Sequence, residues 1–148
     1  MKTNEGGGFI KRCFSFLLTA ILFLTVVPWA SAAMGSEVQP MWTYVTSVAG
    51  KIDISANGTA TISATGTADR KGVTKVTVTA SLQQYNAGKW KEVKSWAATN
   101  DGTAVELTQK SWNVNHGYSY RVVVTAKAYS GTTLLEQGSS TENYGYFA

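Results

Sequence analysis

The stretch GYSYRVVVTAKAYSG, from Gly117 to Gly131, alternates apolar and polar side chains along nearly its whole length. The alternating set on one side comprises Tyr118, Tyr120, Val122, Val124, Ala126 and Ala128. Successive side chains of a β-strand point to opposite faces of the sheet, so this set lies on one face. The stretch therefore predicts a strand with one face in a hydrophobic core and the other in water.

Segments with the same period of two lie before and after this strand, and residues 42–148 contain no helical pattern. Turn signals separate the segments: ANGT at 56–59, NAG at 86–88, NDG at 100–102 and SGT at 130–132. We interpret ANGT as a type I′ hairpin turn, whose two central residues need positive φ. The predicted strands cover 42–55 with a break near Gly50, 60–64, 75–83, 89–99, a short strand at 105–107, 118–129 and 132–141.

Seven short antiparallel strands in about 100 residues are typical of an immunoglobulin-like sandwich. The predicted fold of residues 42–148 is therefore all-β, a seven-stranded antiparallel sandwich in one domain. Its predicted core contains Ile52, Ile54, Ile62, Val76, Val78, Leu82, Val105, Leu107, Tyr120, Val122 and Val124. We expect the domain to fold without a disulfide or a metal, because the only cysteine, Cys13, lies in the N-terminal leader.

Residues 1–33 have the pattern of a secretory signal peptide. They combine the cationic residues Lys2, Lys11 and Arg12, an apolar run over 14–27, Pro28, and the small residues Ala30, Ser31 and Ala32. The apolar run is shorter than the roughly 20 residues of a membrane-spanning helix, so we expect cleavage after Ala32 or Ala33 and no membrane span. Residues 34–41 are expected to form a flexible tail, and the protein is expected to be secreted.

The predicted mature chain carries ten basic and eight acidic residues, a net charge of +2. Such a small charge, without a basic helix or stripe, gives no support to a nucleic-acid partner, and none is predicted. A secreted chain without cysteine is less typical of the disulfide-dense small domains of animals than of a bacterial exoprotein.

The opening stretch resembles the sixth strand of fibronectin type III domains. The residues that carry this resemblance are Tyr120, Val122, Val124, Ala126 and Gly131. It implies that Tyr118 or Tyr120 is a tyrosine-corner residue, whose hydroxyl binds backbone upstream. The whole chain, with EVQPMWTYV, GKWKEVKSW and GYSYRV, looks like an uncharacterised family of small secreted β-domain proteins of Gram-positive bacteria. That resemblance implies secretion and a β-fold, and it carries no activity or site residue.

Residues with catalytic potential are scattered along the chain. The single histidine, His116, lies in a predicted loop, and no second histidine or cysteine completes a transition-metal site. The carboxylates considered lie in predicted strands or turns: Asp53, Glu92, Glu106, Asp69 and Asp101. We predict no catalytic residue, no metal and no cofactor. The sequence leaves open the alternative that folding brings two carboxylates together as a catalytic pair, such as Asp69 with Asp101.

The strongest candidates for a binding site lie in KWKEVKSW, residues 89–96. On a flat strand Trp90 and Trp96 would share one face and Val93 would lie on the other. Either a bulge folds both tryptophans over the core edge, or the strand exposes an aromatic surface flanked by lysines. The predicted contact residues are Trp90, Lys91, Lys94 and Trp96, with Trp96 closer to the core and Trp90 closer to a ligand. Aromatic residues near the domain ends leave the same two interpretations open: Trp42, Tyr44, Tyr144, Tyr146 and Phe147.

The predicted function is a secreted, non-enzymatic module that binds a protein or a polysaccharide at the cell envelope or in the medium. Two alternatives are a small secreted hydrolase and a self-associating structural or matrix protein. The second alternative arises because Thr- and Val-rich edge strands can pair with further strands. The sequence indicates neither a particular ligand nor an oligomeric state.

Overall fold

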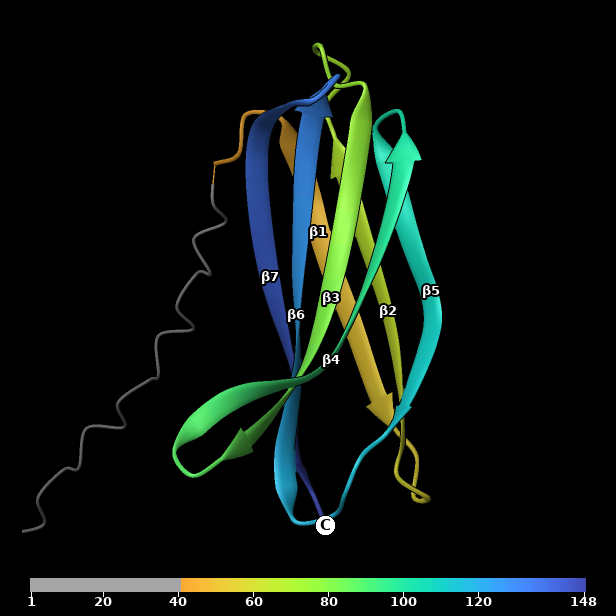
Figure 1. Cartoon of the computed structure of the whole chain (residues 1–148), viewed down its shortest axis with the longest axis vertical. Helices are drawn as coiled ribbons and strands as arrows, with labels where there is room; N and C mark the ends of the chain where they lie inside the picture. The colour runs from red at the N-terminus through yellow and green to blue at the C-terminus, as the bar shows by residue number, and fades with distance from the viewer. Residues whose placement is uncertain (1–40) are drawn as a thin grey trace, which may run out of the picture. The chain divides into compact units, whose positions relative to one another are not determined.

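The structure, a computed structural model, describes residues 41–148. The predicted signal peptide and residues 34–40 of the predicted tail lie outside the described residues. The described part forms seven strands in two sheets, with β1-β2-β5 in one and β4-β3-β6-β7 in the other (Figure 1). The strands are β1 (Val45–Ile54), β2 (Thr59–Ala68), β3 (Lys75–Asn86), β4 (Lys89–Asp101), β5 (Ala104–Asn113), β6 (Tyr118–Ser130) and β7 (Thr133–Phe147).

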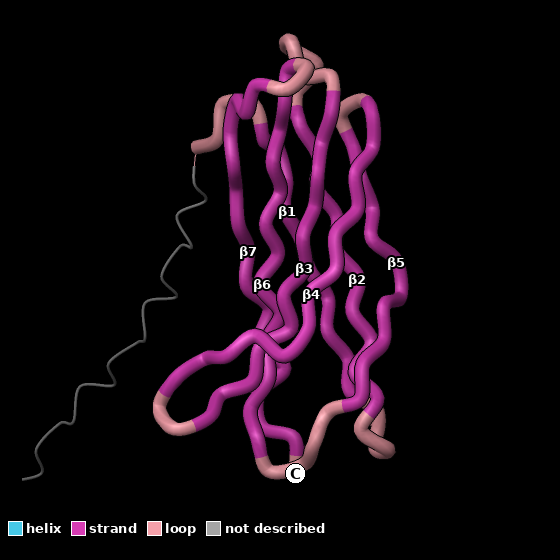
Figure 2. The backbone as a smooth tube through the Cα atoms, viewed as in Figure 1, coloured by secondary structure: helices cyan, strands magenta, loops and turns pink. Residues whose placement is uncertain are grey.

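Every pair of neighbouring strands is antiparallel, and loops and turns connect the strands throughout (Figure 2). The prediction of an all-β fold with seven antiparallel strands over residues 42–148 is therefore confirmed. Among residues 41–148 there is no helix of the length and hydropathy that a membrane crossing requires.

The core lies between the sheets and follows the alternation of the central strands. Strands β2, β3 and β6 bury every second side chain over most of their length. All the predicted core residues are buried, and the structure adds Val45, Ala60, Ala64, Ala68, Val73, Ala80, Ala126, Ala128 and Phe147. The pairing of β3 with β6 has no register shift, so alternate residues of both strands stay on the same face of the sheet along the whole pairing.

Val122→Ala is expected to lower the free energy of unfolding by about 1 to 3 kcal/mol, because it removes buried methyl groups and leaves a cavity. Val122 is fully buried in β6, whereas its neighbour Val123 is partly exposed on the opposite face. Val123→Ala is therefore a matched control, with an expected cost well under about 1 kcal/mol. Urea denaturation measures both costs, and a larger cost for Val123→Ala would contradict the assignment of the two faces.

The predicted break near Gly50 is wrong, because β1 runs through this residue without interruption. Gly50 provides space rather than a turn: a Cβ there would lie 2.6 Å from Val124 Cγ2 on the facing sheet. Gly66 has the same role in β2, where a Cβ would lie 2.9 Å from Ala126 Cβ. The two sheets therefore approach closely at these glycines.

The predicted ANGT hairpin joins β1 and β2, but its turn is not the predicted type I′. Gly58 has a φ of +82°, whereas Asn57 has no positive φ. The Gly58 N–H donates to the Ser55 carbonyl (2.8 Å), and this bond centres the turn on Ala56 and Asn57 rather than on Asn57 and Gly58. One left-handed glycine after the turn then closes the hairpin.

Strands β2, β3, β4, β5 and β7 are longer than predicted, and β5 differs most from its prediction. Strand β5 continues to Asn113, and β7 continues to Phe147. In β5 an extra residue, at Thr108 and Gln109, faces Ser63 of β2, and Gln109 has a φ of +41°. A bulge of this kind interrupts the apolar alternation, although the ladder of hydrogen bonds continues beyond it. The alternation in the sequence therefore predicted too short a strand for β5.

All five register shifts place the extra residue in an edge strand. The extra residues are Thr46 in β1, Val93 in β4, one of Thr108 and Gln109 in β5, and Leu135 and Tyr144 in β7. The inner strands β2, β3 and β6 have none. Bulges twist an edge and interrupt the regular row of N–H and C=O groups that another strand would pair with.

A carboxylate of β7 fastens the start of β1 to the four-stranded sheet. Glu136 accepts three backbone hydrogen bonds, from the N–H groups of Thr43 (2.9 Å), Tyr44 (2.6 Å) and Val45 (2.7 Å). Partial burial acts to raise the pKa of Glu136, but the three N–H donors act in the opposite direction, and the net pKa lies below its ordinary value.

Aromatic side chains close the same side of the sandwich. The Trp42 indole covers Gly138, where a Cβ would lie 2.8 Å from the ring. At the other end of β7, the Tyr144 hydroxyl donates to the Ile54 carbonyl (3.1 Å), and Phe147 is buried. Of the terminal aromatic residues, Tyr146 remains the most exposed, at 66%.

Glu136→Gln is expected to lower stability at neutral pH by about 1 kcal/mol, because a charged acceptor is replaced by a neutral one at a partly exposed site. A lowered pKa means that the stabilisation is present above the unfolded-state pKa of about 4.3 and is lost as pH falls through the lower folded-state value. The variant should therefore lose less stability between about pH 5 and pH 2 than the wild type does. Urea denaturation at several pH values measures this, with Glu142→Gln, an exposed carboxylate of the same strand, as the control. An unchanged pH profile in Glu136→Gln would contradict the role of the three bonds.

Candidate functional site

A bulge at Val93 organises the strand that carries the predicted contact residues. Leu82 of β3 pairs with Lys94, and the next residue, Gln83, pairs with Glu92, so Val93 has no partner. The extra residue reverses the two faces of β4, and Trp90 and Trp96 therefore lie on opposite sides of the sheet. The predicted bulge is present, but it does not fold both tryptophans over the core.

Trp96 lies on the inner face of the four-stranded sheet. It is paired with Ala80, which is fully buried, and it packs against the edge of the core together with Val93 and Ala98. Only part of the Trp96 side chain reaches solvent. Its contacts are those of a residue that closes the core rather than those of a free contact surface.

Trp90 lies on the outer face, beside the tip of the β3–β4 hairpin. It pairs with Tyr85, and the two rings are 5.2 Å apart and tilted by 57°. The Arg121 guanidinium of β6 lies 4.2 Å from the Trp90 ring centre, and Arg121 Nε donates to Gln83 Oε1 (2.9 Å). These four residues, Gln83, Tyr85, Trp90 and Arg121, form the Trp90 cluster.

Strand geometry and hydrogen bonding hold the Trp90 cluster in place. The hairpin tip has positive φ at Ala87 (51°) and Gly88 (77°), as in a type I′ turn, and this turn sets Tyr85 opposite Trp90. The hydrogen bond to Gln83 holds the Arg121 guanidinium beside the indole, at a distance that favours a cation–π contact. The Tyr85 side chain remains 44% exposed, so the cluster presents an aromatic and cationic surface to solvent.

The two predicted lysine contacts do not join Trp90. Lys94 lies on the inner side of β4, with its Nζ 4.7 Å from the Trp112 ring centre of β5. Lys91 pairs with Gln84 on the same side and is exposed. The four predicted residues therefore belong to two surfaces, one on each side of β4, and do not form a single site.

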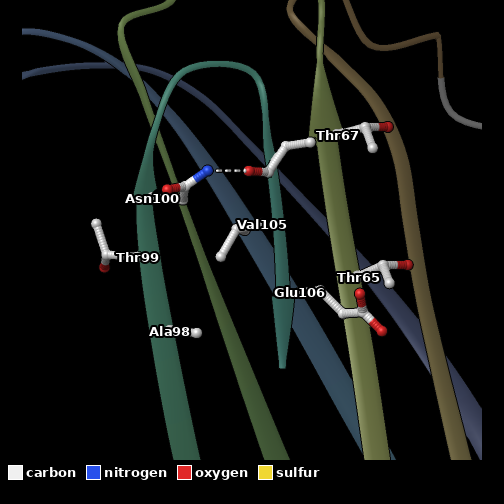
Figure 3. Close-up of a pocket in the computed structure, with 8 residues that line it drawn as sticks. Thr65, Thr67, Ala98, Thr99, Asn100, Val105 and Glu106 are labelled. Atoms are coloured by element: carbon white, nitrogen blue, oxygen red, sulfur yellow. Dashed lines mark hydrogen bonds between the residues drawn. The ribbon is translucent and has the colours of Figure 1, made fainter. Parts of the chain in front are cut away.

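A groove of about 490 Å³ opens beside the beginning of β5. Asn100 of β4 donates to the Ala104 carbonyl (2.9 Å), and Glu106 extends from β5 toward β2, which carries Thr65 and Thr67 (Figure 3). Glu106 is the one ionisable side chain in its lining. The groove thus offers hydroxyl groups and a single carboxylate on an open surface.

Three of the residues considered for catalysis, His116, Asp69 and Glu92, have local partners. The His116 ring stacks on Phe147, with ring centres 4.1 Å apart, and its Nδ1 bonds to an oxygen of Ala148. Asp69 lies 4.0 Å from Lys71, and Glu92 accepts a hydrogen bond from Ser81. Within residues 41–148 no three His, Cys, Asp or Glu side chains are grouped so that they could hold a metal ion.

The sequence prediction did not include Gln83, Tyr85 and Arg121 in the site. A signal for two of them was available: a two-residue turn at Ala87 and Gly88 sets Tyr85 opposite Trp90, and Arg121 belongs to the outward set of the opening stretch. The contact between Arg121 and Trp90 required the order of strands β4, β3 and β6, which the sequence pattern does not contain.

The described residues thus form a two-sheet antiparallel β-domain with an aromatic and cationic cluster on the outer face of its larger sheet. No protein-family model matches the chain, and no curated protein sequence is significantly similar to it. Among solved structures the chain is similar to the solution structure of CsgH from R. palustris, with 12% sequence identity and a TM-score of 0.34. This similarity covers 63% of the present chain and 90% of CsgH, and at that TM-score it carries no functional conclusion.

Proposed function

We propose that this protein is a secreted, non-enzymatic binding module that engages a protein or a polysaccharide outside the cell through the Trp90 cluster. The observation that carries the proposal is the pair of exposed Tyr85 and partly exposed Trp90, which lie opposite each other at the end of the β3–β4 hairpin, with the Arg121 guanidinium beside Trp90. Aromatic and arginine side chains supply large contact areas at low entropic cost, and they are enriched where proteins bind ligands. The leader pattern at residues 1–33 supports secretion.

The strand order supports an immunoglobulin-like, fibronectin type III-like assignment of the fold. Three strands, β1, β2 and β5, face a sheet formed by β4, β3, β6 and β7, as expected for a sandwich with Greek-key connections. Tyr120 adds to this support, because its hydroxyl donates to the Asn115 carbonyl (2.9 Å) and accepts from the Asn115 N–H (3.1 Å). These bonds join the tyrosine to the backbone upstream, as in a tyrosine corner.

The edge strands favour binding of a ligand over self-association. Each of the four edge strands contains at least one bulge, and β4 also carries Lys89, Lys91 and Lys94. Bulges and lysines on edges are devices that oppose the pairing of one chain with another. This feature counts against the alternative of a matrix protein assembled through its strands.

Affinity electrophoresis through gels that contain soluble neutral or charged polysaccharides tests the proposal. We expect at least one polysaccharide to retard the wild-type protein and Trp90→Ala to abolish the retardation. Trp112→Ala is the matched control, because this indole is 42% exposed and lies on the other side of β4. Equal effects of the two substitutions on retardation would contradict the proposal. The proposal would also be contradicted if no gel retarded the wild-type protein and if Trp90 were not needed to capture any envelope protein.

A further inference from the structure

We propose that the ligand is an acidic, carboxylate-bearing polysaccharide that lies along the outer face of the four-stranded sheet, with one end on the Trp90 cluster. This inference rests on the proposed function. It narrows the class of ligand from a protein or a polysaccharide to a polysaccharide that carries carboxylates. Three features of the face support it: its charge, its row of hydroxyl groups and its aromatic end.

The outer face of the four-stranded sheet has a net positive charge, with three cationic and two acidic side chains. The strand pairing places three cationic side chains, Lys75, Arg121 and Lys127, on the outer side of β3 and β6. The outer positions of β3, β6 and β7 include no acidic residue, because the inner-side carboxylates Glu136 and Glu142 pair with buried Ala128 and Val122. The two acids on the outer side, Glu92 and Asp101, lie on the edge strand β4, where Glu92 pairs with Gln83 and Asp101 pairs with Lys75. Lys127 lies on β6 and is separated from both acids by strand β3.

The middle of the same face is lined by hydroxyl groups. Outward-facing threonine and serine residues lie side by side on four strands, and two pairs exchange hydrogen bonds: Thr77 with Thr99 (2.9 Å) and Thr125 with Ser139 (3.0 Å). Each hydroxyl can accept further hydrogen bonds from a ligand. Thr77 and Tyr85 are eight residue steps apart along β3, roughly 26 Å at 3.3 Å per step, and this length accommodates several sugar units.

The aromatic end supplies a contact for a sugar ring next to a carboxylate partner. Tyr85 and Trp90 offer apolar ring surface, and the hairpin tip that carries them bends away from the rest of the sheet (Figure 1). Arg121 Nε donates a hydrogen bond to Gln83 Oε1, whereas the two terminal nitrogens of the guanidinium have no acceptor among residues 41–148. A planar guanidinium with free terminal donors binds a carboxylate in a bidentate manner.

The same features favour a polysaccharide over a protein partner. The central part of a protein interface is usually apolar, and serine and lysine are depleted there. On this face the one outward aliphatic side chain of β6 is Val123, between Arg121 and Thr125, and the neighbouring positions of β3 and β7 are Ser81 and Thr141. A hydroxyl-lined face with lysines at its far end instead matches a chain that carries many hydroxyl and carboxylate groups.

Polygalacturonate and its methyl-esterified form test the inference, because the two polymers share their sugar rings and differ in charge. We expect polygalacturonate to retard the wild-type protein in affinity electrophoresis and the esterified polymer to retard it much less. Arg121→Gln should weaken binding to polygalacturonate on the order of tenfold or more, since a charge-assisted bidentate contact is lost. Lys127→Gln, at the other end of the face, should weaken it by a smaller factor.

Lys51→Gln is the matched control, because Lys51 is an exposed lysine of β1 on the three-stranded sheet. It should leave retardation unchanged, and the melting temperature of each variant shows that the fold is retained. Equal retardation by the two polymers would overturn the inference and leave the proposed binding function intact. Absence of retardation by polygalacturonate, or equally strong binding to vesicles of anionic lipid, would also overturn it.

Discussion

Replacing Trp96 by alanine is expected to lower the free energy of unfolding by about 3 kcal/mol or more. The Trp96 indole packs against the edge of the core beside Val93 and Ala98 on β4, and its pairing partner Ala80 cannot fill the space that the indole leaves. The loss therefore includes both apolar burial and a cavity, and part of the cavity opens to solvent. Urea denaturation and thermal unfolding measure the loss.

Trp90→Ala is the matched substitution on the other face of the same strand. Its indole contacts Tyr85 and Arg121 on the outer surface and does not pack against the core, so the melting temperature should change little. Binding to a polysaccharide that retards the wild-type protein should weaken by roughly 1 to 3 kcal/mol. A stability loss for Trp90→Ala as large as that for Trp96→Ala would show that the Trp90 cluster is structural.

Tyr120→Phe is the second substitution with a large expected effect, roughly 1 to 3 kcal/mol of stability. The Tyr120 side chain is 1% exposed, and its hydroxyl satisfies both the N–H and the carbonyl of Asn115. Phenylalanine fills the same space but leaves these partly buried backbone groups without their partner. Tyr118→Phe is the control on the same strand, because Tyr118 is only partly buried and its hydroxyl has no partner among residues 41–148. Equal costs for the two substitutions in urea denaturation would contradict the role of the Asn115 bonds.

The same tyrosine predicts a loss of stability at alkaline pH. Burial raises the pKa of Tyr120 above its ordinary value near 10, although the hydrogen bond with Asn115 acts to lower it. A raised pKa means that the contribution is complete below about pH 10 and is lost as pH rises through the folded-state value. Tyr120→Phe should therefore flatten the fall in stability above about pH 10, and an unchanged alkaline profile would contradict this linkage.

The core residues could be predicted from the sequence because buried and exposed side chains alternate regularly along the central strands. From Tyr120 to Ala128 every second residue of β6 is buried, and the neighbouring strand β3 in the same sheet follows the same alternation without a register shift. A strand with neighbours on both sides cannot shift its register without moving its apolar side chains into water. Local alternation was therefore sufficient for the core residues Val76, Val78, Val122 and Val124.

The edges and the candidate site were decided by tertiary structure. The sequence showed that Trp90, Val93 and Trp96 cannot all fit one flat strand, but the position of the bulge depends on which residues of β3 pair with β4. Because of the extra residue at Val93, Trp90 lies on the outer face beside Arg121, and Trp96 lies on the inner face against the core. A bulge is a property of the pairing between two strands, and an edge strand with one free side tolerates it, so no pattern within a single strand could fix it.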